Sequence, residues 1–94
     1  MIFITLIKFK KTSLEVSKVG NTLLETLPSG VKMIATYWTL GKFDAVWIYE
    51  APNEKVSLEF VLNMEEVADT ETLVGVSRDD ALKMGMTGPS RNIP

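Results

Sequence analysis

The side chains that could do chemistry in this 94-residue chain are few, because it contains no histidine and no cysteine. Histidine is the commonest general base, and cysteine supplies thiolate nucleophiles and zinc ligands. Ser/His/Asp and Cys/His catalysis are therefore excluded within one chain. The candidate acids and bases that remain are Lys8, Tyr37, Asp44, Glu50 and Glu71.

Asp44 has the most suggestive surroundings of these candidates. It follows Gly41 in the stretch TLGKFDAVWIYEAP and precedes an aromatic-rich apolar run. An apolar pocket could activate this carboxylate as a general base. An aspartate beside a turn can equally accept backbone N–H bonds, and we favour that structural role. Lys8 and Glu50 fall late in the expected strands, where we expect strand-end salt bridges rather than catalysis.

A ligand-binding site is the other chemistry that this region could support, with Tyr37, Trp38, Asp44 and Trp47 as its candidate residues. Trp38, Trp47 and Tyr49 could line a flat apolar slot. They could also be buried between subunits, where aromatic residues are enriched, and we favour the interface.

We expect neither a metal site nor a cofactor. Only carboxylates remain as metal ligands, and the adjacent Glu65 and Glu66 point apart on an expected helix. The chain has no GxxxxGK[ST] or GxGxxG motif, and the glycines at 85 and 88 are too weak a pattern for a phosphate-binding loop.

Charge and composition limit the partners. Ten Lys and Arg residues face twelve Asp and Glu residues, scattered along the chain without a basic run. Nucleic-acid binding and binding to anionic membranes both need clustered basic residues, so we expect neither partner. The opening MIFITLIKFKK is apolar before it is basic, the reverse of a signal peptide, and too short for a membrane span. The expected location is the cytoplasm.

Hydrophobic periodicity predicts the order β-α-β-β-α-β. Alternating, β-branched and aromatic residues predict the strands, and helical spacing after Thr12 and Asn53 predicts the helices. Gly20 falls on the buried stripe of the first helix, where it permits close packing on the sheet. The expected strands are residues 2–9, 31–40, 43–51 and 70–77.

This order is that of a ferredoxin-like α+β sandwich, a four-stranded antiparallel sheet with two helices on one face. We expect residues 1–78 to form this domain. Residues 79–94 would be a C-terminal tail or an oligomerisation arm, beginning with one helical turn and carrying Leu82, Met84 and Met86.

The second and third strands are apolar on both faces. Gly41-Lys42 suggests a two-residue hairpin turn with Leu40 opposite Phe43. Period-2 counting then places Ile34, Thr36, Trp38, Phe43, Ala45, Trp47 and Tyr49 on one face, and Met33, Ala35, Tyr37, Asp44, Val46, Ile48 and Glu50 on the other.

Two helices cover only one face of such a sheet, so an apolar patch would be left in water. We therefore expect the chain to self-associate through this sheet. We assign Ala35, Val46 and Ile48 to the helix side, and Trp38, Trp47 and Tyr49 to the subunit interface.

In TLGKFDAVWIYEAPNE and the later TETL, the sequence resembles the GYD-domain family of ferredoxin-like proteins of the dimeric α/β-barrel type. ITLIKF is similar to that family's first strand, so the resemblance extends from Ile2 to about Ser77. The family's Gly-x-aromatic-Asp motif falls on Gly41, Phe43 and Asp44, with phenylalanine replacing the usual tyrosine. The resemblance implies fold and pairing rather than an activity.

The effector-binding domain of leucine-responsive (Lrp/AsnC-type) regulators is also similar around this hairpin. The DNA-binding helices of those regulators have no counterpart in these 94 residues.

Our leading hypothesis is a cytoplasmic homo-oligomer, built on a dimer, that binds a small apolar or aromatic ligand between sheet and helices. One alternative is a cofactor-independent isomerase or monooxygenase of the dimeric α/β-barrel type, acting with Asp44 or Tyr37. The other is a stand-alone effector-binding module. An acid in an internal cavity would favour the enzyme, and a ligand at a subunit interface would favour the module.

Overall fold

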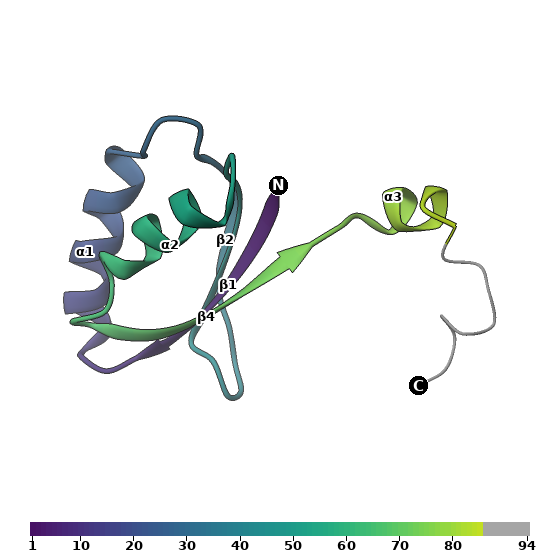
Figure 1. The fold of residues 1–94 in the computed structure, drawn as a ribbon. Coiled ribbons are helices and arrows are strands. Elements are labelled where there is room, and N and C mark those ends of the chain that lie inside the picture. The colour runs from purple at the N-terminus through teal and green to yellow at the C-terminus, as the bar shows by residue number, and fades with distance from the viewer. Residues whose placement is uncertain (86–94) are drawn as a thin grey trace.

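In the computed structural model, which describes residues 1–85, the four strands form one antiparallel sheet in the order β2-β3-β1-β4. Helices α1 and α2 cover the same face of this sheet (Figure 1). The predicted ferredoxin-like βαββαβ order is thus confirmed, with a third, short helix after the last strand. The elements are β1 (Ile2–Phe9), α1 (Ser13–Glu25), β2 (Lys32–Trp38), β3 (Ala45–Glu50), α2 (Glu54–Leu62), β4 (Ala68–Gly75) and α3 (Arg78–Lys83).

Both long helices begin at the predicted capping residues. The Glu15 N–H donates to Thr12 Oγ1 at 3.2 Å while the Thr12 N–H donates to Glu15 Oε2 at 3.1 Å, which is a capping box. The Val56 N–H donates to Asn53 Oδ1 at 3.0 Å. Such a cap typically stabilises a helix by about 1 kcal/mol, so these short motifs set where each helix starts.

The hairpin between β2 and β3 keeps the predicted register but not the predicted turn. Trp38 lies opposite Ala45, which is the register that the predicted pairing of Leu40 with Phe43 requires. The strands stop short of Gly41, however, and the loop closes through the Thr39 N–H donating to the Asp44 carbonyl at 2.9 Å. Gly41 has φ of 102°, a left-handed conformation that suits glycine at the loop tip.

A β-bulge in β2 shifts the predicted alternation. The register moves by one residue between Met33 and Ala35, so Met33 faces Tyr49. Met33 therefore packs against the core, although uniform alternation placed it on the opposite face. A bulge inserts one unpaired residue, here at Ile34, and a strict period of two cannot anticipate it.

Our assignment of the two sheet faces was wrong. Trp47 and Tyr49 lie under the helices, with ring centroids 5.9 Å and 5.2 Å from the ring of Phe60 on α2. Val46 and Ile48, which alternate with them along β3, lie on the uncovered side together with Ala35, the partner of Ile48. Trp38 lies on the helix side with Trp47. The physical reason is space, because Gly20 of α1 has no side chain and the Trp47 ring fills the volume beside it against Phe60, which a smaller aliphatic side chain would leave partly empty.

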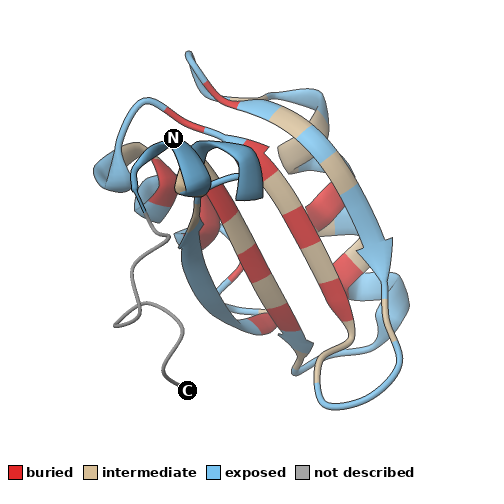
Figure 2. Cartoon of the chain, turned by 90° about the vertical axis from the view of Figure 1, so that its right-hand side faces the viewer, coloured by how far each residue is buried: buried red, intermediate tan, exposed pale blue. Residues whose placement is uncertain are grey.

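The uncovered side of the sheet is nonetheless apolar, as predicted. Figure 2 views the sheet with α1 and α2 behind it and shows buried and intermediate residues alternating along β1 and β3. The strand pairing places Ile2, Ile4 and Leu6 of β1 beside Val46 and Ile48 of β3 on one shared surface. We call the apolar part of this surface the open face, and it consists of Ile2, Ile4, Leu6, Ala35, Tyr37, Val46, Ile48 and Leu73. The charged residues Lys8, Glu50, Asp69 and Glu71 lie on the same side of the sheet.

Helix α3 lies beyond the end of β4, away from the other helices (Figure 1). The Asp80 N–H donates to Ser77 Oγ at 3.1 Å and caps its start. The expected helical turn is confirmed, but it begins at Arg78, before the boundary we set. Leu82 and Met84 are exposed. Met86 lies outside the described residues, and docking of this segment on a neighbouring subunit stays a prediction.

Among residues 1–85, no helix combines the length and the apolar character that a membrane crossing requires.

Candidate functional site

A cavity of about 190 Å³ lies between α1 and the part of the sheet formed by β1, β2 and β3. Residues of the sheet line one side of the cavity, and residues of α1 line the opposite side. Met64, which follows α2, closes the inner end. The lining residues are Ile7, Phe9, Val16, Ser17, Gly20, Asn21, Leu24, Thr36, Trp38, Ala45, Trp47 and Met64.

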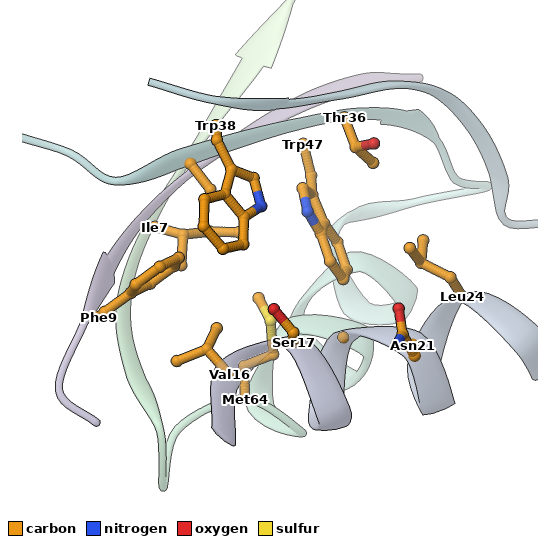
Figure 3. Close-up of a pocket in the computed structure, with 12 residues that line it drawn as sticks. Ile7, Phe9, Val16, Ser17, Asn21, Leu24, Thr36, Trp38, Trp47 and Met64 are labelled. Atoms are coloured by element: carbon orange, nitrogen blue, oxygen red, sulfur yellow. The ribbon is translucent and has the colours of Figure 1, made fainter. Parts of the chain in front are cut away.

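Two tryptophans dominate this cavity. Both indole rings reach from the sheet toward α1, with Ser17 and Asn21 across from them (Figure 3). Trp47 is 7% exposed, whereas Trp38 on the edge strand β2 is 67% exposed. The Phe9 ring holds Trp38 edge-on at 5.6 Å between centroids. Trp47 therefore belongs to the core wall, and Trp38 stands at the mouth.

Gly20 leaves room beside Trp47. A Cβ at this position would lie 3.4 Å from Cζ2 of the Trp47 indole, which is an ordinary contact distance. The predicted close packing of the helix on the sheet at Gly20 is thus present. A larger side chain at position 20 would project toward the indole and fill the cavity.

The polar groups that line the cavity are all neutral. Ser17 and Asn21 come from successive turns of α1, and Thr36 faces them from β2. No Asp, Glu, Lys or Arg belongs to the lining. Such a site can hold an apolar body and offer hydrogen bonds to a neutral polar group, but its own side chains supply neither a general acid nor a general base.

The cavity brings together two of the four predicted site residues, Trp38 and Trp47. Tyr37 lies on the open face, on the other side of the sheet, and is 58% exposed. Asp44 lies in the hairpin loop outside the lining. Our sequence reasoning missed Ser17, Asn21 and Thr36. A signal for the first two existed, because they are polar residues four apart beside the buried stripe of α1.

Asp44 is held by the end of β1. Its Oδ2 accepts the Phe9 N–H at 2.8 Å and lies 3.7 Å from Lys8 Nζ. Its own N–H donates to the Ile7 carbonyl at 2.8 Å. The favoured structural role required a carboxylate that accepts a backbone N–H, and such a bond is present. Its donor belongs to a strand 35 residues away in sequence rather than to the turn itself.

Replacing Asp44 with alanine is expected to lower the melting temperature by a few degrees. The Phe9 N–H would lose a partner whose contribution is on the order of 1 kcal/mol. Asp44→Asn should cost much less, because the amide oxygen can accept the same bond. Differential scanning calorimetry of both variants measures this. If both variants keep the melting temperature of the unmodified protein but lose ligand binding, Asp44 has a functional role instead.

Comparison with known proteins places the chain in a family. The family model described as the GYD domain matches residues 7–84. No match to a curated protein sequence was found.

Solved structures that share the fold include the following three. An AsnC family transcriptional regulator from Agrobacterium tumefaciens aligns with a TM-score of 0.61 at 12% identity, over 82% of this chain and 50% of that one. The protein PH0061 aligns with a TM-score of 0.61 at 19% identity, over 83% of this chain and 53% of that one. The hypothetical protein PHS023 from Pyrococcus horikoshii aligns with a TM-score of 0.54 at 21% identity, over 83% and 93%.

The chain thus spans about half the length of the first two of these proteins. Identities this low show a shared fold and no more. The family model, in contrast, covers most of the sequence, including the Gly-x-aromatic-Asp hairpin that carried the resemblance. The chain belongs to the GYD domain family.

Proposed function

We propose that this GYD-domain protein is a self-associating module that binds a small neutral aromatic ligand in the cavity between α1 and β2. The observation that carries the proposal is Trp38, a large aromatic side chain that stands exposed at the mouth of a cavity whose inner wall is a second tryptophan. An apolar pocket with a few convergent polar groups is the usual form of a small-molecule site.

The lining suggests the chemical class of the ligand. Two indoles offer flat surfaces, and aromatic pairs gain attraction from offset or edge-on contacts beyond the area that they bury. Ser17, Asn21 and Thr36 can donate to or accept from one neutral polar group. A charged ligand would lose hydration without meeting an opposite charge in the lining, which favours an uncharged ring compound.

The open face supports the self-association part of the proposal. Its eight apolar residues come from all four strands of the sheet. No helix or strand of residues 1–85 packs over them. A contiguous patch of this kind is rarely left in water by a soluble monomer. Because the same surface on a second copy is equally apolar, two sheets can cover each other.

One strand connects the two parts of the proposal. β3 presents Trp47 to the cavity and its neighbours Val46 and Ile48 to the open face. A ligand that shifts the Trp47 indole therefore acts on the strand in the middle of the proposed contact. This supports an effector-binding module whose association responds to its ligand. The isomerase or monooxygenase alternative needs Asp44 or Tyr37 beside the ligand, and neither lines the cavity.

Trp38→Ala is expected to weaken the binding of indole about tenfold, because the ligand loses one of its two flat contacts. Isothermal titration calorimetry of indole into the protein measures the affinity. Trp38 is exposed, so its removal should leave the fold intact. Leu40→Ala, in the same hairpin and fully exposed, is the matched control and should bind as the unmodified protein does.

Gly20→Leu provides a second variant, in which a side chain fills the cavity and abolishes binding. Equal indole affinity in the Trp38→Ala variant and the unmodified protein would contradict the proposed site. If indole does not bind at all, the proposal of an uncharged aromatic ligand is wrong.

A further inference from the structure

Four hydroxyl groups form a continuous chain beneath α2. Thr72 Oγ1 lies 2.8 Å from Thr5 Oγ1, which lies 3.1 Å from Tyr49 Oη, which in turn lies 2.6 Å from Ser57 Oγ. Thr5 and Tyr49 are 0% exposed and Ser57 is 2% exposed. A hydroxyl chain of this length in an otherwise apolar core is a polar feature that the proposed function does not use.

Both ends of this chain reach the same cavity. A second hollow of about 190 Å³ lies between α2 and the edge strand β4, on the helix side of the sheet, and both Ser57 and Thr72 line it. The rest of its wall is apolar except for Glu54 at the start of α2. The remaining lining residues are Phe3, Glu54, Leu58, Val61 and Val74.

Counting protons shows what the two ends offer. Each of the four hydroxyls has one proton, and three hydrogen bonds between them use three, so one proton is left over. On Thr5 or Tyr49 it would be buried without an acceptor, since within residues 1–85 neither hydroxyl has a further partner. An unsatisfied buried donor is unfavourable. The spare proton therefore belongs to one end of the chain.

If Ser57 holds the spare proton, every bond in the chain points toward Ser57, and Thr72 offers only lone pairs. If Thr72 holds it, the directions reverse. In either case one end donates while the other accepts, and both ends line the same hollow. A group that complements them must both accept and donate a hydrogen bond, as a hydroxyl or a primary amide does.

We propose that the hollow between α2 and β4 is a second ligand site, for a small neutral alcohol or primary amide with an apolar body. The apolar body contacts Phe3, Val61 and Val74, and the polar group bridges Ser57 and Thr72. The Glu54 carboxylate at the rim disfavours anions. A cation that only donates hydrogen bonds would need acceptors at both ends of the hydroxyl chain. The spare proton would then lie on Thr5 or Tyr49, where it is buried without an acceptor.

The test is a titration of ¹⁵N-labelled protein with benzyl alcohol, with toluene and benzoate as probes of similar size. Benzyl alcohol is expected to shift the amide signals of Ser57, Leu58 and Thr72, and to bind about tenfold more tightly than toluene or benzoate. Shifts confined to Ser17 and Asn21 would place the alcohol in the α1 cavity and overturn the proposal, while leaving the proposed function standing.

Two variants sharpen the test. Thr72→Val removes one end of the chain at an exposed strand position, and should weaken benzyl alcohol about tenfold without affecting toluene. Leu58→Trp should fill the hollow and block the binding of both benzyl alcohol and toluene. Leu62→Trp, on the same helix and outside the lining, is the control and should bind normally. Unchanged benzyl alcohol affinity in Thr72→Val, or toluene binding as tightly as the alcohol, overturns the proposal.

Discussion

Replacing Ile48 with lysine is expected to break the proposed self-association and give a folded monomer. Ile48 lies in the middle of the open face, opposite Ile4 of β1 and Ala35 of β2. In a monomer the lysine ammonium can reach water from this surface. Between two sheets its charge would be buried among the apolar side chains of the open face, which should weaken association roughly a hundredfold or more.

Light scattering coupled to size-exclusion chromatography measures the change in mass, and circular dichroism checks that the fold is kept. Leu62→Lys is the matched control, because it adds the same charge at a half-exposed leucine on α2, on the far side of the sheet. That variant should keep the mass of the unmodified protein. An unmodified protein that is already monomeric at micromolar concentration would refute the interface.

Replacing Trp47 with lysine is expected to unfold the protein rather than to dissociate it. Trp47 is the neighbour of Ile48 on β3, but it points into the core, where it is 7% exposed and packs on Phe60 and Gly20. Truncating a buried tryptophan typically costs about 3–5 kcal/mol, before the buried charge is added. That is a large part of the 5–15 kcal/mol or so by which a domain is usually stable.

Urea denaturation followed by circular dichroism measures this loss of stability. Trp47→Phe is the conservative control, since a phenylalanine ring still fills most of the space beside Gly20, and it should cost clearly less. A Trp47→Lys protein that melts like the unmodified one and has half its mass would restore our original assignment of Trp47 to the subunit interface.

The opposite outcomes expected at positions 47 and 48 follow from the alternation of a strand. The sequence pattern established that these two side chains lie on different faces, since successive residues of a strand always do. It could not establish which face meets the helices, because both sets of residues are apolar. Residues distant in sequence decide which face meets the helices. Gly20 of α1 leaves space beside the Trp47 ring, and Phe60 of α2 packs against that ring.

The same division applies to the candidate site. The Trp38 and Trp47 side chains were predicted to share a face, and they do, because the hairpin register follows from local sequence. Ser17 and Asn21 join them only when α1 packs across the edge of the sheet. Asp44 accepts its hydrogen bond from Phe9, which β1 brings beside the hairpin from 35 residues away.

By itself, the sequence determined the order of the elements, the caps at Thr12 and Asn53, and the apolar character of both sheet faces. These properties depend on residues within a few positions of one another, so local periodicity and capping chemistry specify them. The tertiary structure decided the bulge at Ile34, the burial of Trp47 and Tyr49, and the two cavities. Each of these depends on how much space remains between helices and sheet after packing, which no local pattern contains.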